Sequence, residues 1–169
     1  EMSLIAGSVE VFGRAADIIF ANANGITVNG VEFINTQVAS FVTGLVALQS
    51  GEVIFDVTGG ALVIGIDGVS GSEGLNLVGR TVSLQGLVTA RDQITISGGA
   101  QRFNYNDSAA TSRIGDEPAS QFAIDGTVYG AARAGQVTIL GNETGLGVRL
   151  PGTLQANNGF STLKLHWST

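Results

Sequence analysis

Cysteine is absent from this sequence, and lysine, histidine, proline and tryptophan are nearly so. The chain therefore folds without disulfides or thiolate metal ligands. Acidic residues outnumber basic ones by 14 to 8, and the resulting net charge of −6 argues against nucleic acid as a partner, because phosphate is repelled. The basic residues are scattered, so no polybasic cluster faces an anionic lipid surface. No apolar run approaches the ~18 residues of a transmembrane helix, so we expect no membrane span.

What the sequence does contain is a regular alternation of apolar and polar residues in short segments. Apolar side chains recur at every second position, and glycine, asparagine or aspartate separates the segments. This period indicates half-buried β-strands, whereas helical spacing is rare. The 169 residues fit a single domain, 1–169, and the 25 glycines suit many tight turns. The alternating sets include Val9/Val11, Ile18/Phe20, Ile26/Val28, Phe55/Val57, Leu62/Ile64/Ile66, Val82/Leu84, Ile94/Ile96, Val137/Ile139, Val148/Leu150 and Leu163/Leu165/Trp167.

An internal repeat favours a solenoid over a sandwich or a barrel. Residues 82–96 resemble residues 148–165, and the offset is 148 − 82 = 66 residues, which three coils of ~22 residues would produce. Small residues recur at fixed places because stacked corners must share one shape. We predict an all-β parallel β-helix, a three-sided solenoid with an apolar column inside. The matched positions are Val82/Val148, Leu84/Leu150, Gly86/Gly152, Val88/Leu154, Ala90/Ala156, Asp92/Asn158, Ile94/Leu163 and Ile96/Leu165.

Asparagine and glycine gather in residues 20–36, between short apolar pairs. Glycine adopts positive φ without strain, and asparagine tolerates the same region and can hydrogen-bond its own backbone. We predict that these residues lie at the corners of the first coils and allow for stacked asparagine side chains there. They are Asn22, Asn24, Gly25, Asn29, Gly30 and Asn35.

One segment, residues 106–121, has no strand pattern and contains Pro118. We predict an extra-helical loop or short hairpin that leaves the coil stack there. It is either a plain surface insertion or an excursion that binds a partner, since long loops often carry function.

Signals for catalysis or ligand binding are weak, so we expect no enzyme, no cofactor and no metal site. A glycan-cleaving site needs clustered carboxylates, but Asp17, Asp56, Asp67, Asp92 and Asp125 are spread along the chain as corner residues would be. The single histidine, His166, and Trp167 fit a terminal-strand pair better than a catalytic site. The stretch GNETGLG (141–147) lacks the lysine of a phosphate loop. Asn106 and Asn142 match the three-residue N-glycosylation pattern, which occurs often by chance.

The segment VEVFGRAADIIFANANGITVNGVEFINT (9–36) closely resembles the hallmark of one family. This is the secretion domain of filamentous haemagglutinin-like exoproteins, which bacterial two-partner secretion systems export. Val11-Phe12-Gly13, the Ala21–Ile26 stretch, Asn29-Gly30, Phe33-Ile34-Asn35 and Thr43-Gly44 fit that hallmark. Residues 55–68 and 135–156 resemble later coils of the same domain. The resemblance implies a right-handed parallel β-helix.

This resemblance also implies a function. The family includes adhesins, haemolysins, haem-acquisition proteins and growth-inhibition toxins, and its secretion domain is engaged by the periplasmic domains of an outer-membrane transporter. It implies a secreted or cell-surface location, reached through the periplasm and outer membrane, and a role in virulence. The motif residues for transporter recognition would be Asn22, Ala23, Asn24, Gly25, Asn29, Gly30 and Asn35. Alternatives are a module that adheres directly to host or neighbouring cells and, less favoured, a glycan-active enzyme.

The sequence also departs from the family pattern. Ala23 stands where the family usually has proline, and Val28 and Val31 stand where some relatives have a cysteine pair. The chain opens on Glu1 with no signal-peptide pattern. We therefore expect a fragment of a longer protein that lacks its N-terminal cap and presents open strand edges.

Overall fold

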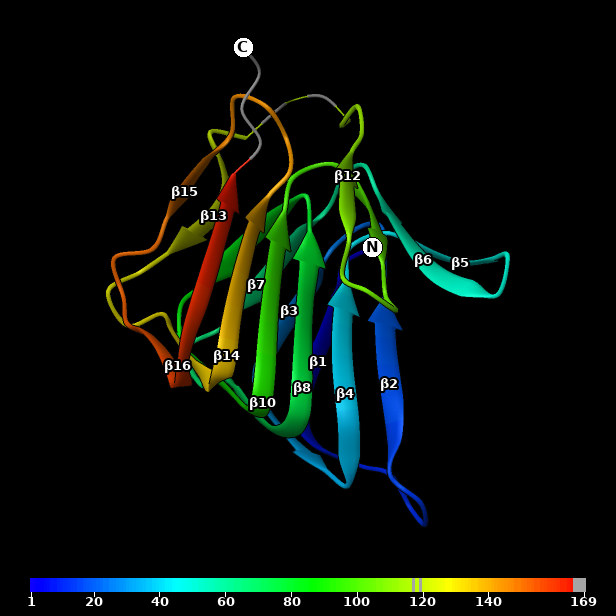
Figure 1. Cartoon of the computed structure of the whole chain (residues 1–169), viewed down its shortest axis with the longest axis vertical. Coiled ribbons are helices and arrows are strands. Elements are labelled where there is room, and N and C mark those ends of the chain that lie inside the picture. The colour runs from blue at the N-terminus through cyan, green and yellow to red at the C-terminus, as the bar shows by residue number, and fades with distance from the viewer. Residues whose placement is uncertain (117, 119, 166–169) are drawn as a thin grey trace.

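The computed structural model describes residues 1–116, 118 and 120–165, and in these residues the chain forms sixteen strands and no helix (Figure 1). Twelve strands belong to one sheet that curls into a solenoid, and four form a separate antiparallel sheet beside it. This confirms the predicted all-β parallel β-helix. The strands of the solenoid are β1 (Ser3–Glu10), β2 (Ala16–Ala21), β3 (Ile26–Ile34), β4 (Thr36–Val42), β7 (Ala61–Ile64), β8 (Val69–Gly79), β9 (Thr81–Leu84), β10 (Leu87–Gly98), β13 (Phe122–Gly126), β14 (Ala131–Gly141), β15 (Gly147–Arg149) and β16 (Leu154–Leu165).

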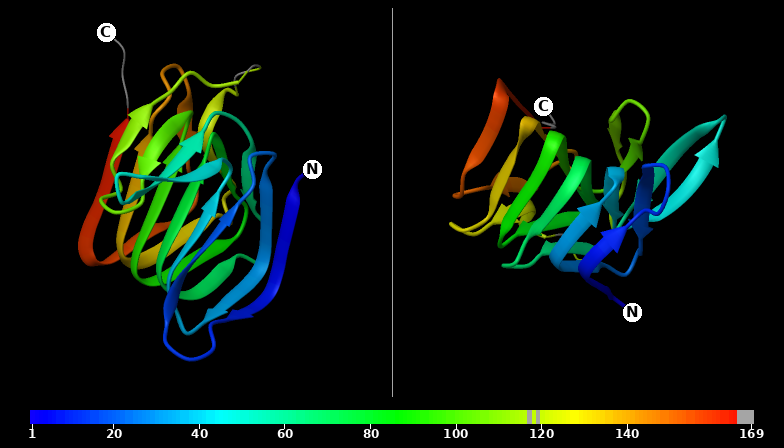
Figure 2. Two further views of the ribbon diagram at one scale, coloured as in Figure 1. Left: turned by 90° about the vertical axis from the view of Figure 1, so that its right-hand side faces the viewer. Right: turned by 90° about the horizontal axis from the view of Figure 1, so that it is seen from below.

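Each coil of the solenoid has three faces, which we name A, B and C in chain order. Face A contains the first halves of β1 and β3, followed by β7, β9, β13 and β15. Face B contains the second halves of β1 and β3 and the first halves of β8, β10, β14 and β16. Face C contains β2, β4 and the second halves of those four long strands. All these pairings are parallel, and each joins the same face of two neighbouring coils. The backbone hydrogen bonds between strands therefore run along the solenoid axis (Figure 2).

Inward side chains stack in register and form the predicted apolar column. On face A the column runs Ile26, Leu62, Val82, Ile124, Val148. On face C it runs Ala39, Leu75, Ile94, Val137. Most of these side chains are fully buried, and each such burial contributes roughly 1.5–3 kcal/mol. One coil cannot cover its own inward face, so the stability of each coil comes from its neighbours.

The 66-residue repeat is present, but it spans two coils and not three. Val82 pairs with Ile124, which pairs with Val148, so the steps are 42 and 24 residues. The longer step contains an insertion of about one coil's length, and in the sequence this insertion was counted as an additional coil. The last matched positions of the repeat are also shifted. The sequence alignment matched Leu163 with Ile94, but in the structure Leu163 lies in register with Ile139, which lies in register with Ile96.

Two insertions leave the solenoid at the same corner, between faces C and A, and build the antiparallel sheet together. The predicted departure near 106–121 is confirmed, although it begins earlier, at Gln101. The prediction that Phe55 and Val57 lie in a solenoid strand was wrong, because they lie in the other insertion. The strands are β5 (Leu45–Gln49), β6 (Glu52–Val57), β11 (Gln101–Asn104) and β12 (Ala110–Ser112), in the order β12-β11-β6-β5.

The antiparallel sheet packs on the outer surface of face C and encloses a second apolar core. Phe55 and Phe103 stack with ring centroids 5.8 Å apart, and both are fully buried. They cover outward side chains of the solenoid, chiefly Val42 and Val78. In β4, β8 and β10, face C is therefore buried on both sides, whereas faces A and B meet solvent.

Candidate functional site

The asparagine-rich motif forms three consecutive bends of the solenoid. The first bend is a β-turn between β2 and β3, in which the Gly25 N–H donates to the Asn22 carbonyl at 3.0 Å. The Asn22 Oδ1 accepts the Asn24 N–H at 3.0 Å, and the Asn22 amide donates to Ser3 Oγ at 2.8 Å. Gly25 has φ +115°, and a Cβ there would lie 2.9 Å from the Ala61 carbonyl, so only glycine fits. Ala23 occupies the second position of the turn.

The second bend, Asn29-Gly30, lies inside β3, where the strand passes from face A to face B. The Asn29 amide donates to Asp67 Oδ2 at 2.7 Å, and Asn29 Oδ1 accepts the Asp67 N–H at 3.0 Å. Asn29 thus pairs with the aspartate at the equivalent corner of the next coil. At this corner an Asn–Asp pair is present in place of the stacked asparagine side chains that the sequence allowed for.

The third bend is Asn35, between β3 and β4, in the left-handed region at φ 55°. Its amide donates to the carbonyls of Val11 and Gly13, at 2.7 and 2.9 Å. These two bonds fix the preceding coil's bend on either side of Phe12, whose side chain is 87% exposed. The seven motif residues therefore lie on three different corners and do not form a single pocket.

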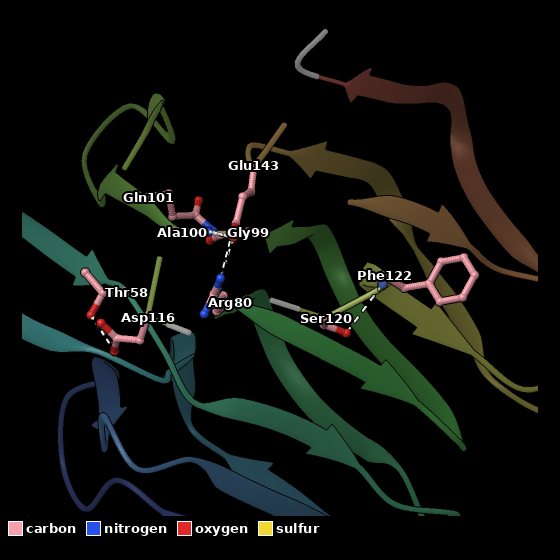
Figure 3. A network of polar contacts seen from close by, with 9 residues as sticks. All are labelled: Thr58, Arg80, Gly99, Ala100, Gln101, Asp116, Ser120, Phe122 and Glu143. Carbon is pink, nitrogen blue, oxygen red and sulfur yellow. Dashed lines mark hydrogen bonds and ion pairs between the residues drawn. The ribbon is translucent and has the colours of Figure 1, made fainter. Parts of the chain in front are cut away.

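A buried ion pair, which sequence reasoning missed, lies at the corner where the insertions leave the solenoid (Figure 3). Arg80, just before β9, donates through Nε and Nη2 to the two carboxylate oxygens of Glu143, at 3.1 and 2.9 Å. The side chains are only 7% and 15% exposed. The Ala100 N–H also donates to Glu143, at 2.8 Å. One carboxylate thus joins the corners of three successive coils, and the second insertion begins at the middle one.

Burial of Glu143 raises its pKa, but hydrogen bonds from Arg80 and the Ala100 N–H outweigh that effect and hold the pKa below its ordinary value. The carboxylate is therefore ionised in the folded protein at neutral pH. A sequence signal for this pair did exist, because Arg80 interrupts an otherwise apolar stretch, and a buried arginine requires a partner.

The second insertion is also fixed at its far end. A Cβ at Gly115 would lie 2.5 Å from guanidinium atoms of Arg80, so the loop backbone lies directly against that group. The Asp116 N–H donates to the Thr58 carbonyl at 2.8 Å, and Thr58 Oγ1 donates to Asp116 Oδ2 at 3.2 Å (Figure 3). The loop after β12 is thus bound to both the solenoid and the first insertion.

The five aspartates considered for catalysis each have a different neighbour. Asp17 accepts from the Val38 N–H and from the Tyr105 hydroxyl, the latter at 2.6 Å. Asp67 is hydrogen-bonded to Asn29. The other three form ion pairs with three different arginines: Asp56 with Arg113, Asp92 with Arg91 and Asp125 with Arg149. Within the described ranges, no three His, Cys, Asp or Glu side chains lie close enough to hold a metal. His166 and Trp167 lie outside the described residues.

The two candidate glycosylation residues differ in their surroundings. Asn142 donates its amide to Ser97 Oγ at 2.8 Å and to Gln101 Oε1 at 3.0 Å, and modification in the folded protein would break both bonds. Asn106 is exposed and uses only its carbonyl oxygen, which accepts the Val53 N–H at 3.3 Å. Glycosylation at either residue stays a prediction.

Comparison with known proteins gives a consistent result over the whole chain. Residues 1–164 match the TPS secretion domain family. The chain is 35% identical over 169 residues to filamentous hemagglutinin of Bordetella pertussis, covering 94% of this chain and 5% of that protein. It is 34% identical over 161 residues to the 16S rRNA endonuclease CdiA of Enterobacter cloacae, covering 93% and 5%. It is 31% identical over 162 residues to a hemolysin of Proteus mirabilis, covering 94% and 10%.

The fold has a solved counterpart. A crystal structure of the filamentous hemagglutinin secretion domain superposes with a TM-score of 0.83 and 26% identity, covering 97% of this chain and 72% of that one. The chain spans from 5% to 10% of the length of the three relatives named above. None of the described residues forms a helix long and apolar enough to cross a bilayer.

Proposed function

Since the chain belongs to the TPS secretion domain family, we propose that an outer-membrane transporter recognises it through the asparagine motif and that the motif nucleates folding during export. The chain is the secretion domain of a secreted bacterial exoprotein that is displayed at the cell surface.

The observation that supports nucleation is the closure of the first and third bends within chain that precedes the insertions. The first bend is closed by bonds among Asn22, Asn24 and Gly25, and the Asn35 amide reaches back to Val11 and Gly13, whereas the Asn29 pair with Asp67 spans 38 residues and the first insertion. Contacts over short chain segments form with little loss of chain entropy, so the first and third bends form before the long-range pairing of the insertions. A corner of fixed shape then presents β3 as a template for β7 and β8.

The physical driving force for export in this proposal is burial. Each coil that emerges adds buried side chains such as Leu62, Leu75 and Leu77 to the column, at roughly 1.5–3 kcal/mol each before the entropy of ordering is subtracted. Backsliding through the transporter would require that burial to be undone. Net movement outward therefore needs no nucleotide hydrolysis at the outer membrane.

Export of paired glycine variants tests the proposal. Gly25→Ala places a Cβ 2.9 Å from a carbonyl in the motif, whereas Gly145→Ala adds one at a similar positive φ with nothing within 4 Å. We expect Gly25→Ala and Asn24→Ala to lower the amount of exoprotein in the medium several-fold and Gly145→Ala to leave it near the native level. Normal export of both motif variants would refute a role for the motif.

We further propose that this chain is not itself an enzyme. The endonuclease activity for which the Enterobacter cloacae relative is named belongs to a protein of which this chain matches 5%. The five aspartates lie on separate elements with separate partners. Asp56 shares a groove with a further carboxylate, Asp116, but both are engaged, Asp56 by Arg113 and Asp116 by Thr58. Adhesion, haemolysis or toxicity of the complete exoprotein would then depend on other parts of it.

A further inference from the structure

The first insertion forms an arm that projects from the body of the molecule. Strands β5 and β6 make a hairpin whose tip, Ser50-Gly51, has positive φ at both residues, as in a rigid two-residue turn. Two perpendicular views show the hairpin extending away from the solenoid (Figures 1 and 2). In the part of the chain that the structure describes, β5 is the last strand of its sheet, and nothing pairs with its outer edge.

The backbone of β5 presents hydrogen-bonding groups to that free edge. Leu48 lies opposite Val53. Val53 uses its N–H and C=O on the other side, toward Asn106 Oδ1 and the Tyr105 N–H, at 3.3 and 2.9 Å. Because bonding alternates along an antiparallel pair, Leu48 and Val46 point their N–H and C=O groups outward. The edge therefore offers two donors and two acceptors.

Four of the five side chains of this edge are apolar, and none is charged. Leu45, Val46 and Leu48 are 69%, 43% and 74% exposed, and no charged residue occurs within β5. The opposite edge of the sheet, β12, is only three residues long, which limits pairing there. An exposed apolar edge without lysine, proline or a bulge is the type that pairs with another strand.

We propose that β5 pairs in antiparallel fashion with β5 of a second copy of this chain, about a two-fold axis at Ala47. In that register Val46 faces Leu48 of the other copy, and the reverse pair follows by symmetry. All four outward-pointing groups on each edge then find partners. Ala47 meets its own counterpart in a pair that is not hydrogen-bonded, where side chains approach most closely and a small residue fits.

Charge supports a second copy as the occupant. Each copy carries a net charge of −6, so most contacts between two copies would oppose like charges. The β5 edge is a place where two copies meet without that opposition. Leu48 lies on the same face of the sheet as Phe55, which packs against the solenoid, yet Leu48 is highly exposed. The solenoid therefore does not extend beneath β5, and this leaves room for the other copy.

The contact is small, and this sets its strength. Five residues per copy bury far less than the roughly 1,200 Å² of a stable complex. The pair is therefore transient in dilute solution and becomes populated where many copies are held close together, as on a cell surface. Pairing through β5 does not depend on recognition by a transporter.

A single introduced cysteine tests the register, because the chain has none of its own. In the complete 169-residue chain, Ala47→Cys places two sulfurs across the axis at a spacing that suits a disulfide. We expect its dimer to form under mild oxidation at least about tenfold faster than that of the control Ile66→Cys, although Ile66, on a solenoid corner, is 72% exposed and Ala47 is half-buried.

A second change separates strand pairing from chance collision. Adding Leu48→Lys or, as an independent variant, Val46→Pro to Ala47→Cys should reduce cross-linking to the rate of Ile66→Cys, with unchanged circular dichroism. Leu48→Lys places a charged side chain opposite the apolar Val46 of the other copy, with the two lysines diagonal to each other across the axis, and Val46→Pro removes an outward N–H that β6 does not use. Equal cross-linking of Ala47→Cys and Ile66→Cys would overturn the proposal. So would rapid cross-linking that both edge variants leave unchanged. If Ala47→Cys does not cross-link while Leu48→Lys abolishes export, the edge belongs to a strand of another protein.

Discussion

Removing Glu143 should destabilise this protein more than any single change at an exposed ion pair. Glu143→Ala deletes a carboxylate that accepts three hydrogen bonds, two from Arg80 and one from the Ala100 N–H. It leaves the Arg80 guanidinium, 7% exposed, without this counter-charge. Breaking a buried pair by removing one partner costs about 3–5 kcal/mol, because the remaining charge stays desolvated.

A double-mutant cycle isolates the pair from the other contacts of each residue. Arg80→Ala, Glu143→Ala and the double variant are compared with the native chain by urea unfolding, under conditions where the slope with urea is unchanged. We expect a coupling energy on the order of 2 kcal/mol, since the double variant leaves no buried charge behind.

The chain provides a matched control in Arg149 and Asp125. This pair has the same two-pronged geometry, with both distances 2.8 Å, but its side chains are 59% and 39% exposed. Solvent screens exposed pairs, so the same cycle should give a much smaller coupling energy. If the two cycles gave equal couplings, burial would not be the cause of the effect, and the reasoning would fail.

The pH dependence of the pair follows from the lowered pKa of Glu143. Because the folded pKa lies below the unfolded value of 4.5, the contribution of the pair is present above pH 4.5 and is lost as pH falls through the folded pKa. The difference in stability between the native chain and Glu143→Gln should therefore stay constant near neutral pH and shrink in acid. A difference that grew in acid would contradict the assignment.

Three further changes have defined outcomes. Burial first, and then the hydrogen bond to Asp17, raise the pKa of Tyr105 above 10.0, so its contribution is present below pH 10 and lost above it; Tyr105→Phe should lower the melting temperature at pH 7 and flatten its alkaline decline. Ala23→Pro should raise the free energy of unfolding by about 0.4–1 kcal/mol, because a proline suits the second turn position, and destabilisation in urea would contradict that turn. Asn35→Gly should be less destabilising in urea than Asn35→Ala, because glycine keeps the positive φ while both lose the two amide bonds; equal losses would show that the bonds alone matter.

The sequence predicted those features that depend on local chemistry. The alternation of Ile26 and Val28 set strand positions, and the asparagine and glycine residues of segment 22–35 set the bends, because turn geometry is decided within a few residues. It did not predict the first insertion, since Phe55 and Val57 alternate as solenoid strands do. Only the tertiary context distinguishes a strand beside the stack from one within it.

The site at the insertion corner depended on contacts that no local pattern encodes. Arg80 and Glu143 are 63 residues apart, and the number of coils between them could not be counted while an insertion of one coil's length was taken for a coil. The same error gave three coils for the 66-residue repeat. Lengths of insertions are not limited by the solenoid period, so sequence spacing alone could not correct it.

The second core changes how the molecule should come apart. In a plain repeat array each unit touches only its neighbours, so the ends fray and unfolding spreads unit by unit. Here the antiparallel sheet joins Ile19 in the first coil, Val42, Val78 and Leu140 into one cluster, and the Tyr105 hydroxyl reaches back 88 residues to Asp17. The array thereby gains the cooperativity of a globular domain. Amide hydrogens of β2 and β14 should exchange with solvent together, through one global opening, although β4, β8 and β10 separate the two strands on face C.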